Sequence, residues 1–174
     1  EGAQIELIRA RADYISGRLK ILLENGLSGL GLVLILLFLF LNARTAFWVA
    51  AGIPTAMLAA LAMMYAAGIT INMISLFALI ITLGIVVDDA IVVGESIHHH
   101  REDLGLPAED AAIAGTSAVA RPVIFAVLTT VVAFAPWAFL SGPQSEFLRH
   151  LSAVIAFALA FSLIEAFFIL PAHL

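Results

Sequence analysis

The sequence predicts an all-α fold, a polytopic bundle of five membrane-spanning helices. Hydrophobic residues make up 63% of its 174 residues and charged residues only 12%, and its mean hydropathy is +1.09, a composition far outside the range of soluble domains. Five separate apolar runs occur along the chain, and a run of about 20 apolar residues is long enough to cross roughly 30 Å of hydrocarbon. Water is therefore not the main solvent of this chain.

Residues 1–25 are predicted to form an amphipathic lead-in helix, because apolar residues recur among charged ones at mostly helical spacing. These apolar residues are Ile5, Leu7, Ile8, Ile15, Leu19, Leu22 and Leu23. The first span is predicted at residues 26–42. It is an uninterrupted apolar run that ends at Asn42 and Arg44, polar groups suited to the headgroup region.

The second span is predicted at residues 46–67, with Phe47 and Trp48 at one membrane interface. Pro54 lies inside it, and neighbouring helices can satisfy the carbonyl that a proline leaves without a donor. The third span, at residues 71–93, follows a link so short that these two spans are antiparallel neighbours.

A short cytoplasmic linker helix is predicted at residues 107–119, after a polar stretch. Pro107 suits the first turn of a helix, and Glu109 follows near the positive end of the helix dipole. The fourth span is predicted at residues 122–140 and the fifth at residues 148–170, each ended by proline-containing sequence.

Five spans place the two ends of the chain on opposite sides of the membrane. The loops at residues 42–46 and 94–121 hold three arginines, whereas the other two loops hold only Arg149. Because basic residues favour the cytoplasmic side, the first two loops are predicted to be cytoplasmic. The net charge of -5, with no long block of either sign, gives no indication of a nucleic-acid partner.

The third span contains two adjacent carboxylates, Asp88 and Asp89, in an otherwise aliphatic helix. Each ionised aspartate near the centre of a spanning helix costs roughly 2.5–3.5 kcal/mol on insertion scales. Protonation, a cation from another helix or a water-filled cavity must compensate for this cost. All three favour a position inside the protein over one that faces lipid.

The spacing of polar residues predicts which side of this helix faces inward. Ser75, Thr82, Asp89 and Ser96 recur every seven residues and form one stripe, which drifts by only about 20° per step. Asp88 lies about 100° around the helix, on the side of Ile81 and Gly84, where a small residue allows a close helix approach. The two carboxylates are therefore predicted to face different neighbours.

Two carboxylates so close together in a poorly solvated site do not both ionise easily, and they titrate as a coupled unit. We interpret Asp88 and Asp89 as a proton relay, in which gain and loss of a proton alternates with making and breaking an ion pair. No Lys or Arg lies well inside any of the five spans. The partner cation is therefore expected from a part of the protein outside this chain.

Two other interpretations of the aspartates compete with the relay. A satisfied polar pair can hold a bundle together, although such a structural role seldom needs two adjacent charges. An intramembrane aspartyl protease needs two acids that flank one scissile bond from different helices, and adjacent residues on one helix point apart.

Other polar residues receive weaker predictions. Ser75, Thr82, Glu95 and Glu165 are candidate supporting polar residues, and for Glu165 a position at the interface is favoured over a second proton site. The consecutive residues His98 to His100 are expected on a solvated surface rather than around a metal, because they diverge by 100° each.

The sequence also resembles a known family. The segment from Gly84 to Glu95 resembles the fourth transmembrane helix of resistance-nodulation-division (RND) efflux permeases. Further likenesses cover nearly the whole chain. They are Asn25-Gly26-Leu27, Ile53-Pro54, Phe134-Ala135-Pro136, Phe139-Leu140-Ser141-Gly142 and Leu170-Pro171-Ala172. The paired aspartates resemble the hydrophobe and amphiphile exporters, whereas the metal exporters of the family typically carry Asp-Ala there.

The resemblance implies that the chain corresponds to helices two to six of a twelve-helix permease in the bacterial inner membrane. Residues 1–25 would then lead in from a periplasmic domain, and residues 26–174 would form the transmembrane bundle. The family works as a homotrimer with a periplasmic adaptor and an outer-membrane channel. By this likeness Asp88 and Asp89 carry protons and face a lysine on the tenth helix. No covalent chemistry and no cofactor are expected, because protons are the coupling ion.

Two alternative functions remain open from the sequence. A heavy-metal exporter of the same family predicts a methionine-lined pathway, and the four methionines form no such track. A non-transporting membrane scaffold predicts that Asp88→Asn and Asp89→Asn leave activity intact. The exported compound is not indicated by these residues.

Overall fold

The computed structural model describes residues 2–142 and 145–174, with side chains from residue 13 onward, and every regular element in these ranges is helical. The elements are α1 (Gly2–Phe40), α2 (Ala43–Ala66), α3 (Met73–Glu102), α4 (Ala108–Ala138), α5 (Ser145–Ile164), the π-helical turn η1 (Glu165–Ile169) and α6 (Leu170–His173). The last three form one continuous rod.

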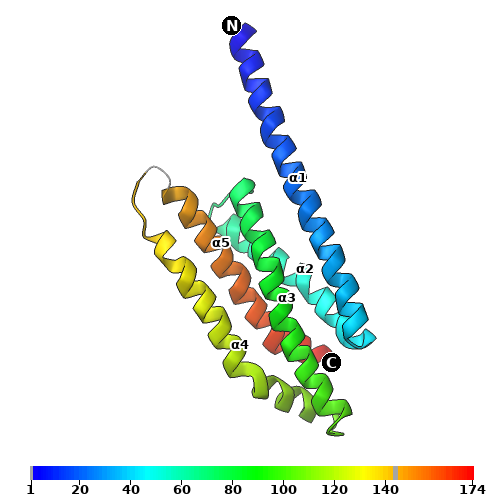
Figure 1. Cartoon of the computed structure of the whole chain (residues 1–174). Coiled ribbons are helices and arrows are strands. Elements are labelled where there is room, and N and C mark those ends of the chain that lie inside the picture. Colours follow the sequence, from blue (N-terminus) through cyan, green and yellow to red (C-terminus); the bar gives the residue numbers. More distant parts are fainter. Residues whose placement is uncertain (1, 143–144) are drawn as a thin grey trace.

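Five helices are long and apolar enough to cross a membrane. They cover Asp13–Phe40, Ala43–Ala66, Met73–Glu102, Ala108–Ala138 and Ser145–His173. The two ends of the chain lie at opposite ends of the bundle, as five spans require (Figure 1). The predicted all-α fold with five spans is confirmed.

Four helix boundaries differ from the predicted ones. Helix α3 continues nine residues past the predicted end at residue 93, to Glu102, so the first part of the predicted loop at 94–121 is helical. The lead-in and the first span form a single helix, α1, which continues through Gly26. The linker helix and the fourth span likewise form one helix, α4, which continues through Pro122. The fifth span continues past Pro171 to His173, because η1 widens the helix immediately before the proline.

Side-chain hydrogen bonds fix the residues at which α2 and α3 begin. Asn42 begins α2, where its side-chain oxygen accepts from the Thr45 amide at 2.9 Å. Asn72 begins α3 with a capping box, in which its side chain accepts from the Ser75 amide and the Ser75 hydroxyl accepts from the Asn72 amide. These caps satisfy donors that the first turn of a helix leaves free.

Helix α3 lies at the centre of the bundle and packs against α1, α2, α4 and α5 (Figure 1). Helix α1 is the least enclosed, and its N-terminal half extends beyond the other helices (Figure 1). The buried core follows α3 along two clusters, one toward α2 and η1 and the other toward α5. The helix that carries both aspartates therefore packs against all four other spanning helices.

Gly115 brings α4 into direct contact with the backbone of α3. A Cβ atom at this position would lie 2.6 Å from the Ile97 Cα and 2.9 Å from the Ser96 carbonyl oxygen. The Ser96 hydroxyl donates to the Gly115 carbonyl at 2.8 Å. Small residues that permit such backbone contact are typical of helix packing in membranes.

We expect Gly115→Ala to destabilise the protein by about 1–3 kcal/mol, because the added methyl group meets rigid backbone. Thermal unfolding of the detergent-solubilised protein measures the change. The matched control is Gly31→Ala in α1, where a Cβ atom meets nothing within 4 Å. Equal stability of the Gly115→Ala and Gly31→Ala variants would contradict the close α3–α4 contact.

Candidate functional site

Asp89 lies in the middle of α3 and is buried, with only 6% of its surface exposed. Its Oδ2 atom has no hydrogen-bond partner among the described residues. Ser162 of α5 faces this carboxyl, and the Ser162 hydroxyl is itself buried without a hydrogen-bond partner in the described part of the chain. A buried carboxyl with an unsatisfied oxygen is costly, so this site is a candidate for function.

The polar stripe predicted on α3 faces the interior of the bundle. Ser75 and Thr82 are fully buried, and Ser96 contacts α4 through its bond to Gly115. The hydroxyls of Ser75 and Thr82 bond to carbonyls of their own helix or its preceding turn, Thr82 to Ala78 at 2.9 Å. Asp89 is therefore the member of the stripe whose polar atoms are not satisfied.

Asp88 is exposed on a different side of α3. No Lys or Arg in the side-chain-resolved ranges, 13–142 and 145–174, forms an ion pair with either aspartate. Gly84, one turn earlier, has no described atom within 4 Å of the position of a Cβ. The expected close helix approach at Gly84 thus has no partner among the described helices, and this side of α3 is open.

Glu95 lies two turns after Asp88 and is also exposed. A spacing of seven residues places these two acids on the same side of the helix. Glu95 does not join the buried surroundings of Asp89.

Glu165 is more deeply buried than either aspartate, with 2% of its surface exposed. Its carboxyl lies against Gly52 of α2, at a point where a Cβ atom would overlap it, and Oε2 has no described hydrogen-bond partner. This position differs from the expected interfacial one. The sequence pattern did not show that a glycine more than a hundred residues away opens a space for this side chain.

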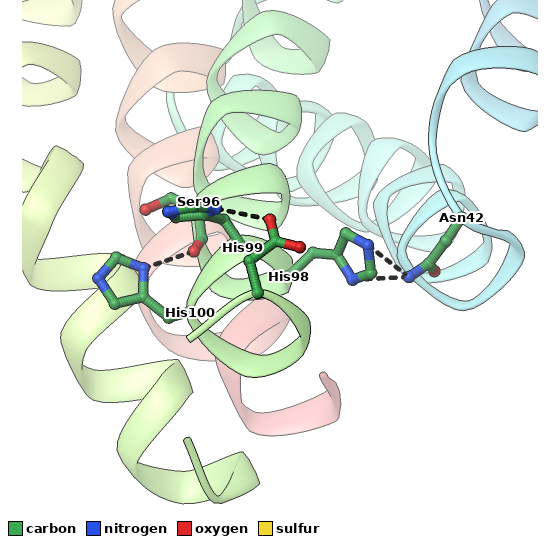
Figure 2. Close-up of polar contacts among 6 residues, drawn as sticks. Asn42, Ser96, His98, His99 and His100 are labelled. Atoms are coloured by element: carbon green, nitrogen blue, oxygen red, sulfur yellow. Dashed lines mark hydrogen bonds and ion pairs between the residues drawn. The ribbon is translucent and has the colours of Figure 1, made fainter. Parts of the chain in front are cut away.

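Near the end of α3, the His98 ring points toward Asn42, whereas the His99 and His100 rings lie edge to face with centroids 5.7 Å apart (Figure 2). His98 contacts the Asn42 amide at 2.8 Å, His99 contacts Asp103 at 2.7 Å, and His100 donates to the Ser96 carbonyl at 2.8 Å. No group of three His, Cys, Asp or Glu residues suited to a metal ion occurs in the part of the chain that the structure describes. The His98 ring connects the end of α3 with the start of α2, whereas the His99 and His100 rings bond within α3 and its C-cap.

The sequence matches the AcrB/AcrD/AcrF family over residues 1–174. The chain belongs to this family. Relatives include the multidrug resistance protein MdtC of Salmonella arizonae, with 33% identity over 168 residues, and the proteins of the same name from Salmonella schwarzengrund and Salmonella paratyphi B, also at 33%. Each alignment covers 96% of this chain and 16% of the relative.

The resemblance to RND efflux permeases is thereby confirmed, and the chain is part of a multi-pass membrane protein. It spans about one sixth of the length of the curated relatives that it matches. The family match does not assign a role to any individual residue. The positions of Asp88, Asp89 and Glu165 therefore rest on the geometry of this AcrB/AcrD/AcrF chain alone.

Sequence reasoning missed Ser162 and Gly52. Ser162 interrupts an apolar run one turn before Glu165, and this spacing of three residues could have indicated a shared face. Gly52 carries no comparable signal, because a glycine in a spanning helix is common.

We expect Gly52→Ala to lower the stability of the permease, because its methyl group would displace the Glu165 carboxyl. In a Glu165→Ala background the same change is expected to cost little. The coupling in this double-mutant cycle, measured by thermal unfolding, is expected to be on the order of 0.5–3 kcal/mol. A second cycle pairs Gly52→Ala with Glu146→Ala, at an exposed acid of α5, where additive effects are expected. Additivity in both cycles would contradict the contact.

Proposed function

We propose that this chain is a transmembrane part of a proton-driven efflux permease that exports amphiphilic compounds, and that Asp88 and Asp89 form its proton relay. The observation that carries the proposal is the placement of Asp89, which is buried at mid-span with an unsatisfied carboxylate oxygen. Intramembrane acids that face a protein interior are by default functional groups.

The different exposure of the two aspartates supports a relay rather than a fixed structural pair. Asp89 faces α5 inside the described bundle, whereas Asp88 lies on the open side of α3. A cation supplied from outside this chain can approach Asp88 from that side. Loss of a proton would then be compensated by an ion pair, and gain of a proton would release it.

The proton gradient across the membrane supplies the energy for such a relay. One proton that moves through 100 mV supplies about 2.3 kcal/mol. A relay of this kind forms no covalent bond and needs no cofactor, because the proton itself is the coupling ion. The protein therefore acts as a transporter and not as an enzyme.

An amphiphile exporter is favoured over a metal exporter by the name of the relatives, multidrug resistance protein. By the same likeness the permease would lie in the bacterial inner membrane as a homotrimer. It would work with a periplasmic adaptor and an outer-membrane channel, and a lysine on the tenth helix would face the aspartates.

We expect Asp88→Asn and Asp89→Asn each to lower proton-coupled export by at least about a hundredfold, the lower end of what a positioned proton-transfer group contributes. Asparagine has nearly the shape of a protonated aspartate, so trimer assembly is expected to persist. The assay is export of a fluorescent amphiphile by the full-length permease in vesicles with an imposed proton gradient.

The matched control for these variants is Glu102→Gln, at an exposed acid near the end of the same helix. It is expected to export at the parental rate. Parental export by both aspartate variants would overturn the relay and favour the scaffold.

A further inference from the structure

A third buried acid, Glu165, remains outside the proposed aspartate relay. With 2% of its surface exposed, it is enclosed by η1, α2 and α5, and its Oε2 has no hydrogen-bond partner among the described residues. An ionised carboxyl in such a place would be an uncompensated charge in a medium of low dielectric. The arrangement therefore fits a carboxyl that carries a proton.

The backbone at this position is distorted. Glu165 begins the π-helical turn η1, in which the Leu170 amide donates to the Glu165 carbonyl. Pro171 follows and has no amide proton, so regular α-helical bonding would break here. Single π-turns inside helices occur frequently at functional sites.

A cavity of about 230 Å³ lies beside the Glu165 carboxyl. Since one water molecule occupies about 30 Å³ in the liquid, the cavity has room for several. Its polar lining comes from Glu165, Thr55 and His173, and the Trp48 ring covers one side. Water in this space can reach the buried carboxyl.

The imidazole of His173 lies at the end of the bundle and lines the same cavity. Its ring is 4.1 Å from that of Trp48, and its Nδ1 bonds to the Ile169 carbonyl at 2.7 Å. Arg44 of α2 donates to the His173 carbonyl at 3.2 Å. The imidazole can pass protons between bulk water and the cavity.

The Ser162 hydroxyl of α5 is near Asp89 and one turn from Glu165, and no hydrogen bond joins it to either carboxyl in the described residues. Ser162 lies three residues before Glu165, hence on the same face of the helix, and faces Asp89 of α3. Four buried side-chain atoms lack a hydrogen-bond partner in the described residues, and three of them are Asp89 Oδ2, Ser162 Oγ and Glu165 Oε2. A hydroxyl both donates and accepts, as a proton carrier between two carboxyls must.

The charged and titratable groups that face Glu165 come from the elements packed around it. They are His173 on α6, which lines the cavity, and Asp89 on α3, and α5 contributes the neutral Ser162. Arg44 of α2 lies outside the cavity lining and bonds to the His173 carbonyl. Among the described residues no cation forms an ion pair with the Glu165 carboxyl.

We propose that Glu165 is a second proton-binding carboxyl of the permease, loaded through the cavity beside His173 and exchanging its proton with Asp89 through Ser162. In this exchange the Ser162 hydroxyl gives its proton to the Asp89 carboxylate and takes the proton of Glu165, so that one proton moves in total. The exchange with Asp89 rests on the proposed relay, whereas proton binding at Glu165 does not.

Infrared difference spectroscopy of the full-length permease tests proton binding directly. Glu165→Gln is expected to remove the carbonyl stretch of one protonated carboxyl, because glutamine has nearly the shape of protonated glutamate and keeps the fold. The same band is expected to persist in a permease with Asp88→Asn and Asp89→Asn. The control Glu146→Gln is expected to leave the band in place. Identical spectra of the parent and Glu165→Gln at every pH would overturn the proposal.

The exchange step is tested by transport in the same vesicles. Ser162→Ala is expected to slow proton uptake by about tenfold or more, and Ser162→Thr is expected to retain it, because a hydroxyl is kept. Uptake at the parental rate by Ser162→Ala would remove Ser162 from the path. Loss of the Glu165 band with full export by the aspartate variants would remove the aspartate relay and leave Glu165 as a proton site.

Discussion

The arrangement of this chain depends on one constraint, that hydrocarbon does not solvate an ionised carboxyl. Asp88, Asp89 and Glu165 lie well inside the spans, and the two that are buried, Asp89 and Glu165, both face other helices of the bundle. The same constraint explains why α3, which carries the aspartates, is the central helix. A helix at the edge of the bundle would expose these groups to lipid on more sides.

The small residues of the bundle act together with this constraint. The hydrophobic effect does not bring helices together in lipid, so close packing and hydrogen bonds must do so. Gly115 allows α4 to reach the backbone of α3 beside Ser96, and Gly52 makes room for the Glu165 carboxyl. In both places a missing side chain allows a polar group to lie inside the bundle. Glycine in these spans therefore places polar groups as well as helices.

The sequence predicted the fold and the inward face of α3 because both follow from periodicity. Runs of apolar residues have the length of a bilayer, and the seven-residue spacing from Ser75 to Asp89 fixes one side of a helix. The continuity of α4 and the burial of Glu165 were not predictable in this way. They depend on contacts between distant segments, above all Gly52 with Glu165, and on a π-turn that no local pattern indicates.

The surroundings of the three acids differ in a way that matters for proton exchange. A fixed cation beside a carboxyl would favour its ionised form and oppose proton binding. Glu165 instead lies against Gly52 and apolar side chains, with a cavity on one side. No ion pair among the described residues therefore fixes the Glu165 carboxyl in its ionised form. Asp88 lies on an open side of α3, where a cation can approach and withdraw. A carboxyl that changes its charge during a cycle needs one of these two settings, because a permanent ion pair would fix it in one state.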